Sequence, residues 1–194
     1  MTTIMSTFMT TTLKEETLLT FLLIFYKDKI QILKDIVYQN NPLSLRIIDW
    51  LVTNYSKKYN VIYPICKNNG DIIYFNIYLD YKNQLKAYSK KFFDPFCRQK
   101  RIIINCDKLT WENCLLDTSK IDKNNYIVTT VGQLNFFKWF LENKIFDFAI
   151  LNIKLIDFDM GSVFINKKKG KRLVLSENAV KGVFTSKQNV IIKF

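Results

Sequence analysis

The spacing of apolar residues predicts two helices in the first sixty residues. Over residues 15–39 the apolar positions extend beyond one helical face, so this helix is expected to be covered by other parts of the chain. Pro42 ends it, and Ser44 is placed to cap a second helix. From Leu45 to Tyr55 apolar residues recur at the i, i+3, i+4, i+7 spacing of one helical face. The second helix is therefore expected to pack one side against the core.

The middle of the chain changes to β-branched and aromatic residues, which favour strands. Two such runs within residues 61–81 are separated by the turn signal NNGD, and this pattern predicts a β-hairpin. A helix is expected over residues 82–92, ended by the Asp94-Pro95 pair. The run RIIINC that follows, residues 101–106, predicts a third strand.

The last third of the chain mixes both kinds of pattern. Residues 126–131 predict a short strand, and a helix is expected from about Val131 to Ile153 with Thr129 or Thr130 as its N-cap. The segment DFDMGS, residues 157–162, is interpreted as a turn. Three short strand candidates follow, with the segment NKKKGKR as a turn between the first two: GSVFI, RLVLS and NVIIKF.

This order of helices and strands lacks the regular βαβ alternation of parallel sheets. We therefore predict an α+β fold with a mostly antiparallel sheet and three to four helices. The 194 residues, 48% of them hydrophobic, suffice for one core. We expect a single domain over residues 14–194, preceded by a loose tail at residues 1–13. The apolar run Leu18–Tyr26 is about half as long as a membrane span, so it predicts a buried helix and no transmembrane segment.

Composition excludes several kinds of active site. The chain has no histidine, which removes the most common general base, the most common zinc ligand and every serine–histidine or cysteine–histidine pair. The four cysteines include no C-x-x-C pair, so buried or idle reduced thiols are expected instead of a zinc site. We predict no metal, no cofactor and no enzymatic activity.

One segment concentrates the positive charge of the chain. The whole protein carries a net charge of +12, which favours a polyanionic partner. Between Tyr81 and Ile102 there are seven basic residues and one acid, Asp94, with aromatic residues between them. Either this segment holds a polyanion, or it is a solvated basic face with no ligand.

The helix expected at the start of this segment separates apolar from basic positions. Its core-facing side is expected to contain four residues: Tyr81, Leu85, Tyr88 and Phe92. Lys82, Lys86 and Lys90 share the neighbouring face at i, i+4 and i+8, and no acid lies among them. Like charges at this spacing destabilise a helix by about 0.2–0.5 kcal/mol per pair. The uncompensated row therefore favours an anionic partner.

A second basic cluster, NKKKGKR, lies near the C-terminus. It is expected to present its side chains at a hairpin tip, where phosphate contact, a nuclear localisation signal and a solvated loop are the alternatives. Together the two clusters give the predicted nucleic-acid-binding residues: Lys82, Lys86, Lys90, Lys91, Arg98, Lys100, Arg101, Lys167, Lys168, Lys169, Lys171 and Arg172.

An enzymatic alternative rests on the segment LDYK. Asp80 and Lys82 form a D-x-K pair with Asp71 upstream. Metal-dependent nucleases use two carboxylates to hold Mg²⁺ and a lysine beside the attacking water or the phosphate. Alternation along a strand argues against this site, because two residues an odd number of positions apart point to opposite faces. The nuclease is therefore the third of our hypotheses.

Three segments resemble a protein family found across large nucleocytoplasmic DNA viruses of the mimivirus and iridovirus kind. They are SLRIIDWLVTNYSKKYN, YKNQLKAYSKKFFDPFCRQKRI and TTVGQLNFFKWFLENKIFDF, which span Ser44 to Phe148 with gaps. The resemblance implies a viral origin and an intracellular setting, in a cytoplasmic factory or the virion. It transfers no catalytic residues, because members of that family carry no firmly assigned activity. Abundant lysine, asparagine and isoleucine also fit an AT-rich viral genome, which offers a second explanation of the charge.

These patterns lead to one principal hypothesis and one alternative. We expect a non-enzymatic viral protein that binds nucleic acid through phosphate contacts, in the first place DNA without sequence preference. It would be an accessory in replication, transcription or packaging, located in the host cytoplasm or the virion, with the nucleus as a further option. The alternative is a structural or assembly component of the virion that binds an acidic protein partner or a membrane.

Overall fold

The computed structural model describes residues 2–66, 70–114, 118 and 121–169, and side chains between residues 13 and 163 of these. The chain divides into two compact units, Met1–Met160 and Gly161–Phe194. In the second unit the structure describes only the end of the last helix. The features below therefore belong to the first unit unless stated otherwise.

The first apolar segment forms two helices instead of the single one expected. Helix α1 (Thr2–Tyr26) and helix α2 (Ile30–Val37) are separated by a short turn, where the backbone of Lys29 leaves the helical region with a φ of −127°. Leu19, Leu22 and Tyr26 of α1 are buried. Residues of the expected loose tail belong to α1 from Thr2 onward. The division into a tail and a domain at residue 14 stays a prediction.

The second expected helix is confirmed, with an internal change of helical type. It comprises α3 (Leu45–Trp50), a π-helical segment η1 (Leu51–Tyr55) and the short α4 (Ser56–Lys58). Ser44 caps α3 as expected, because its hydroxyl oxygen accepts a hydrogen bond from the Ile47 backbone N–H at 3.2 Å.

The expected hairpin is also confirmed, but its second strand is shorter than the sequence suggested. Strand β1 (Ile62–Cys66) pairs antiparallel with β2 (Ile72–Asn76). The next apolar residues start helix α5 (Ile77–Phe92) instead of continuing the strand. Asn76 explains the change, because its side chain accepts a hydrogen bond from the Leu79 N–H at 3.0 Å and caps the new helix.

A three-stranded antiparallel sheet follows α5. Its order is β4-β3-β5, with β3 (Ile102–Asn105) in the centre, β4 (Trp111–Asn113) on one side and β5 (Tyr126–Thr129) on the other. Strands β3 and β5 confirm the predictions made from RIIINC and YIVTTV. Strand β4 has too few β-branched or aromatic residues to be recognised from the sequence, and its pairing with β3 defines it.

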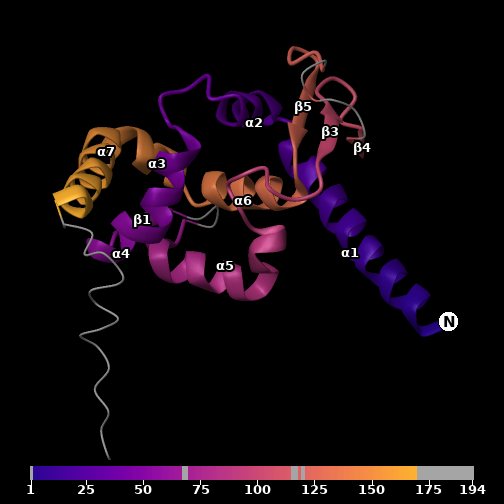
Figure 1. Cartoon of the computed structure of the whole chain (residues 1–194), viewed down its shortest axis with the longest axis horizontal. Helices are drawn as coiled ribbons and strands as arrows, with labels where there is room; N and C mark the ends of the chain where they lie inside the picture. The colour runs from indigo at the N-terminus through magenta and orange to yellow at the C-terminus, as the bar shows by residue number, and fades with distance from the viewer. Residues whose placement is uncertain (1, 67–69, 115–117, 119–120, 170–194) are drawn as a thin grey trace, which may run out of the picture. The chain divides into compact units, whose positions relative to one another are not determined.

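Helix α6 (Val131–Glu142) lies at the centre of the first unit, with α1 and α5 packed against it (Figure 1). Thr130 caps it as expected, accepting a hydrogen bond from the Gln133 N–H at 3.1 Å. Nearly every residue of α6 as far as Phe140 is buried. Phe136 and Trp139 lie 5.2 Å and 5.3 Å from the Phe93 ring, centroid to centroid, and form an aromatic core with it.

The last described helix, α7 (Ile145–Lys169), corrects two predictions. Residues 157–162, interpreted as a turn, are helical, and so is the expected strand 161–165. A single glycine at position 161 does not end the helix, because a lone Gly costs only about 1 kcal/mol relative to Ala. The further strand candidates RLVLS and NVIIKF lie outside the described residues.

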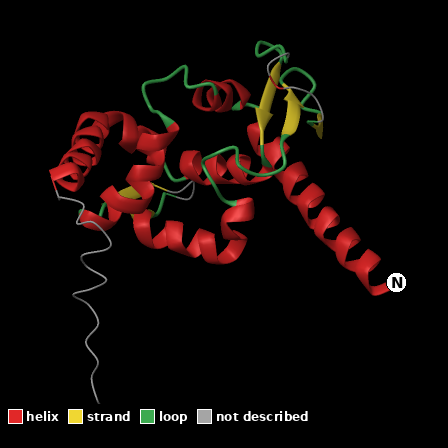
Figure 2. Cartoon of the chain, viewed as in Figure 1, coloured by secondary structure: helices red, strands yellow, loops and turns green. Residues whose placement is uncertain are grey.

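These elements confirm the α+β class with antiparallel sheets, and the helices outnumber the three to four expected (Figure 2). The apolar run Leu18–Tyr26 belongs to α1, which buries part of it in the core. Across the described part of the chain, no helix combines the length and the apolar content that crossing a membrane requires.

Candidate nucleic-acid interface

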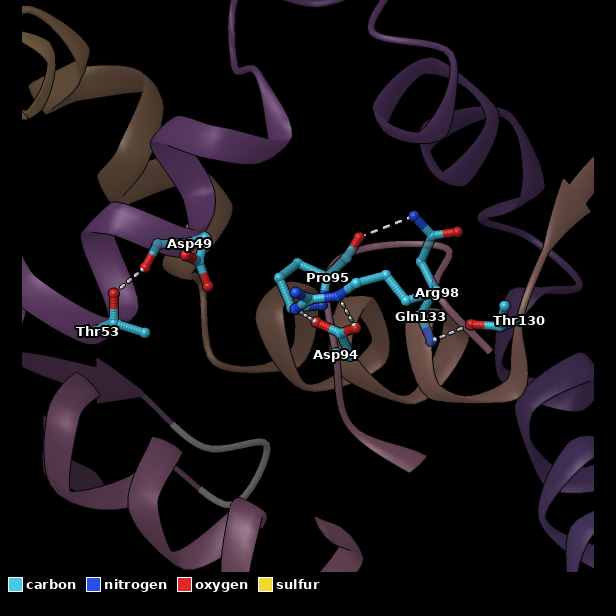
Figure 3. A network of polar contacts seen from close by, with 7 residues as sticks. All are labelled: Asp49, Thr53, Asp94, Pro95, Arg98, Thr130 and Gln133. Carbon is cyan, nitrogen blue, oxygen red and sulfur yellow. Dashed lines mark hydrogen bonds and ion pairs between the residues drawn. The ribbon is translucent and has the colours of Figure 1, made fainter. Parts of the chain in front are cut away.

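The basic segment is anchored at its centre by an ion pair. Arg98 donates from Nε and Nη2 to the two carboxylate oxygens of Asp94, at 2.8 and 2.7 Å (Figure 3). The Asp94 side chain is 7% exposed, whereas that of Arg98 is 61% exposed. A bidentate pair of this kind is strong and orients the guanidinium. Arg98 was predicted to contact phosphate, but its charge already balances a buried carboxylate.

Polar groups from the first turn of α6 hold the loop that follows α5. Gln133 donates from Nε2 to the Pro95 carbonyl at 2.8 Å, and its Oε1 accepts from the Thr129 hydroxyl at 2.9 Å. Asn135 donates to the Phe92 carbonyl at 2.9 Å. The loop is therefore fixed by side chains that are themselves buried and fully paired.

The loop also approaches the α6 backbone closely at Gly132. A Cβ atom at this position would lie 2.7 Å from the Lys91 carbonyl oxygen, which is shorter than a normal contact. The Asp94 N–H donates to the Gly132 carbonyl at 3.2 Å. Glycine is therefore required here for the close approach of two backbones.

A second carboxylate, that of Asp49 on α3, also interacts electrostatically with Arg98. Burial raises the pKa of Asp49 on α3, Arg98 lowers it, and Asp94 raises it. Burial raises the pKa of Tyr81 to about 12, and the two carboxylates act in the same direction. Because Arg98 is paired with Asp94 and also interacts electrostatically with Asp49, this cluster favours a structural role over anion binding. The i, i+4 spacing of Asp94 and Arg98 was visible in the sequence, whereas the contribution of Asp49 was not.

A different surface carries exposed lysines without acidic neighbours. Lys82 and Lys86 lie on the exposed face of α5, one and two helical turns after Tyr78. The Lys57 ammonium lies 5.7 Å from the centre of the Tyr78 ring. Within the described residues, none of these three lysines forms an ion pair. We refer to Lys57, Tyr78, Lys82 and Lys86 as the α5 basic row.

Lys90 does not continue this row as predicted. The backbone of Ser89 has φ 57° and ψ 170°, so α5 is kinked there and the helical spacing does not carry over to Lys90. Lys90 instead lies near Asp49, whose pKa it lowers. The same kink turns the expected core side: Tyr88 is exposed, and Phe93 is buried.

The remaining basic residues before β3 occupy separate places. Lys91 is exposed, and its ammonium lies 4.9 Å from the centre of the Phe92 ring. Lys100 lines a hollow of about 100 Å³ together with Glu15 and Glu16 of α1, whose charges oppose its own. Arg101 lines a different cavity, of about 520 Å³. The structure therefore divides the predicted basic segment into several groups. The α5 basic row is the group that faces solvent without acidic side chains among its members.

The second predicted cluster is only partly described. The backbone of Lys167, Lys168 and Lys169 is helical at the end of α7, so the expected turn is wrong for these residues. Lys171 and Arg172 lie outside the described residues. Their role as phosphate contacts stays a prediction.

The nuclease hypothesis loses its geometric basis. Asp80 lies in the first turn of α5 and not at a strand end, and it accepts a hydrogen bond from the Trp139 indole at 2.6 Å. Asp71 precedes β2 in the hairpin. Groups of three or more His, Cys, Asp or Glu side chains that could hold a metal are not found among the described residues. Asp80 therefore has a structural role between α5 and α6.

A buried carboxylate on α7 shows why Lys58 does not join the α5 basic row although its neighbour Lys57 does. Asp159 accepts hydrogen bonds from the Trp50 indole and the Tyr59 hydroxyl, each at 3.0 Å, and from the Lys58 ammonium. Burial alone would raise the pKa of Asp159, but these donors outweigh it and the pKa is lowered. The hydrogen bond to Asp159 raises the pKa of Lys58. Lys58 therefore forms an ion pair that links α4 to α7.

Comparison with known proteins confirms the resemblance noted from the sequence. A model described as a family of unknown function (DUF7197) matches residues 7–190. "Uncharacterized protein L507" of Acanthamoeba polyphaga mimivirus is 40% identical over 138 residues, which are 71% of this chain and 49% of that protein. The chain thus spans about half the length of this relative. No solved structure matches. The chain belongs to the viral family of unknown function DUF7197.

Proposed function

We propose that this protein binds nucleic acid without sequence preference, in the first place DNA, and that the α5 basic row contacts the phosphates. The proposal is carried by one observation. Lys57, Lys82 and Lys86 are exposed, and within the described residues they form no ion pair. Phosphate contacts by lysine side chains position a protein on nucleic acid without specifying sequence.

The repulsion between the lysines of the α5 basic row favours an anionic partner for this surface. Lys82 and Lys86 stand at i, i+4 and repel each other by about 0.2–0.5 kcal/mol. A phosphate between them would replace this repulsion with attraction. The ring of Tyr78 lies beside the lysines, where it can pack against a sugar or a base. The proposed role is an accessory one in viral replication, transcription or packaging, in the host cytoplasm, the virion or the nucleus.

The test is a titration of the full chain with labelled single- and double-stranded DNA and RNA between 50 and 200 mM salt. Three phosphate contacts would make log Kobs fall with log[salt] with a slope of about −2 to −3. The variant K82Q/K86Q should reduce the magnitude of this slope by about 1 to 2. Failure to bind any of these ligands at low salt, or a slope near zero, would overturn the proposal.

A matched control separates the row from the overall charge of the protein. Lys14 on α1 and Lys154 on α7 are also exposed, so K14Q/K154Q removes the same charge from other helices. It should change the salt slope by less than K82Q/K86Q does. Equal effects of the two variants would show that binding depends on net charge and not on the α5 basic row.

One observation favours a second candidate function, a structural or assembly role in the virion. Leu151, Leu155 and Phe158 lie at i, i+4 and i+7 on α7 and are 83%, 58% and 77% exposed. Exposed apolar stripes of this kind are typical of protein–protein contacts. Under this hypothesis the lysines would bind an acidic protein partner. Binding to polyglutamate at least as tight as binding to DNA of equal charge would favour this second function.

A further inference from the structure

The cavity lined by Arg101 combines positive charge at its rim with an apolar interior. It has a volume of about 520 Å³, within the range of about 300–1,000 Å³ usual for small-molecule sites. Lys123 supplies a second cation, and among the described residues that line the cavity none carries a carboxylate. Leu45 from α3 and Val128 from β5 contribute apolar surface. Such a lining suits a ligand with an apolar body and an anionic group.

Among the described residues, the acidic side chain beside the rim is Asp122, which stands against two cations, Arg101 and Lys123. Asp122, next to Lys123, uses both carboxylate oxygens in its own turn, where they accept from the Asn124 N–H at 2.9 Å and the Asn125 amide at 2.7 Å. Burial raises the pKa of the Cys97 thiol, although Arg101 acts in the opposite direction. The thiol is thus neutral near pH 7 and leaves the charge of Arg101 available.

The aromatic ring in the lining is held in one position. The Tyr38 hydroxyl donates to the Tyr126 carbonyl at 2.8 Å and accepts from the Val128 N–H at 3.3 Å. It thereby satisfies two backbone groups of β5. The Lys123 ammonium lies 5.6 Å from the centre of the ring. A planar group that enters the cavity would therefore meet a fixed aromatic ring beside a cation.

A buried polar side chain of the lining, Gln133, has both of its amide heavy atoms engaged in the fold. Gln133 is buried and uses its amide nitrogen on the Pro95 carbonyl and its amide oxygen on the Thr129 hydroxyl (Figure 3 shows the first of these). A base in the cavity would be held mainly by stacking on Tyr38, which makes little distinction between bases. This agrees with binding that lacks sequence preference.

We propose that the cavity holds one nucleotide, with its base against Tyr38 and its phosphate on Arg101 and Lys123. The nucleotide could be part of a single strand, in which case this inference rests on the proposed function. It could also be a free nucleotide, which has the same chemistry. The test distinguishes these two sources. In a duplex the base is stacked and paired, so the site should favour single strands.

The first arm of the test is a calorimetric titration at low salt with thymidine 5′-monophosphate, with thymidine and inorganic phosphate as ligand controls. The monophosphate should bind saturably and more tightly than either control. R101Q and K123Q should each weaken it about tenfold or more, because each removes a charge-assisted contact. K108Q, a change at an exposed lysine that does not line this cavity, should have no effect.

A cavity-filling variant, V128F, keeps the charge and should also abolish nucleotide binding. Both charge variants alter exposed side chains, so the test remains decisive if V128F does not fold. No saturable binding would overturn the inference, and so would binding that R101Q and K123Q leave unchanged. Phosphate binding as tight as nucleotide binding would also overturn it, since the cavity would then be unused.

The second arm compares oligothymidylate with a duplex of equal charge. V128F, or R101Q/K123Q, should weaken the single strand and spare the duplex. Mononucleotide binding without any polymer binding would identify a free-nucleotide site and would contradict only the proposed function. Salt-dependent polymer binding without mononucleotide binding would contradict only the cavity inference.

Discussion

Helices α5 and α6 pack against each other, yet their side chains are used in opposite ways. Nearly all of α6 as far as Phe140 is buried, and the polar side chains of its first turn are paired. Along α5 only Ile77 and Tyr81 are buried, and two lysines of the exposed face have no ion-pair partner among the described residues. The comparison teaches that the dense aromatic and basic segment after Tyr81 is not one surface. Tyr81, Phe93 and the acid Asp94 are buried in the core, and a few of the lysines remain for a partner.

The largest expected effect comes from truncating the aromatic core of α6. Phe136→Ala should lower the free energy of unfolding by about 3–5 kcal/mol, because it leaves a cavity among fully buried rings. Tyr88→Ala on α5, where the ring is 36% exposed, should cost about 1 kcal/mol. Urea unfolding of both variants measures the difference. Similar losses would show that α5 is as much a part of the core as α6.

The next effect concerns the ion pair between Asp94 and Arg98, which anchors the loop that follows α5. Arg98→Ala should cost about 2–3 kcal/mol, below the usual range for a fully buried pair because Arg98 itself is largely exposed. Arg101→Ala, at an exposed arginine that forms no ion pair with any described residue, should change stability by less than about 0.5 kcal/mol. Chemical denaturation of the two variants gives the comparison. If both variants lose the same small amount of stability, the ion pair between Arg98 and Asp94 does not stabilise the fold.

A smaller, pH-dependent effect is expected at Asp159, the buried carboxylate outside both helices. Its pKa in the folded protein is lowered, so its contribution is present above the unfolded value of about 3.9 and is lost as the pH falls through the folded value. Asp159→Ala should cost about 1–3 kcal/mol at pH 7, since it removes the acceptor of hydrogen bonds from the Trp50 indole, the Tyr59 hydroxyl and the Lys58 ammonium. Unfolding measured from pH 7 to pH 3 should show the gap to the wild type shrinking. A gap independent of pH would contradict this account.

The smallest effect on stability is expected in the α5 basic row. K82Q/K86Q removes a repulsion of about 0.2–0.5 kcal/mol and breaks no contact of the fold. The variant should therefore be as stable as the wild type or slightly more so, by thermal unfolding. A clear loss of stability would mean that these lysines serve the fold, and the contrast between α5 and α6 would fail.

Local signals in the sequence predicted most of the elements. Ser44 and Thr130 were recognised as caps because capping depends on residues three positions apart. The start of α5 was missed, since Ile77–Tyr81 is as β-branched and aromatic as the strand before it and Asn76 alone marks the change. The helix expected over residues 131–153 is divided into α6 and the first part of α7. The rest of α7 was missed because partners such as Trp50, far away in the sequence, hold its carboxylate.

The candidate site was predicted only in part, because local patterns place some of its residues and tertiary contacts place the others. The exposed positions of Lys82 and Lys86 follow from helical spacing, which the sequence contains. The kink at Ser89 displaces Lys90 from the row, and no local signal in the sequence predicts this kink. Lys57 reaches Tyr78 only through the packing of α4 against α5, so no local pattern could join them. Tertiary contacts decided which of the predicted lysines remain together.

Lysine acetylation footprinting with mass spectrometry, with and without saturating DNA, tests the central claim most directly. It measures the reactivity of every lysine of the wild-type protein at once, so no substitution can disturb the fold. The account predicts that DNA protects Lys57, Lys82 and Lys86, and that Lys14 and Lys154 react as before. Equal protection of all exposed lysines, or protection that spares the α5 basic row, would contradict it.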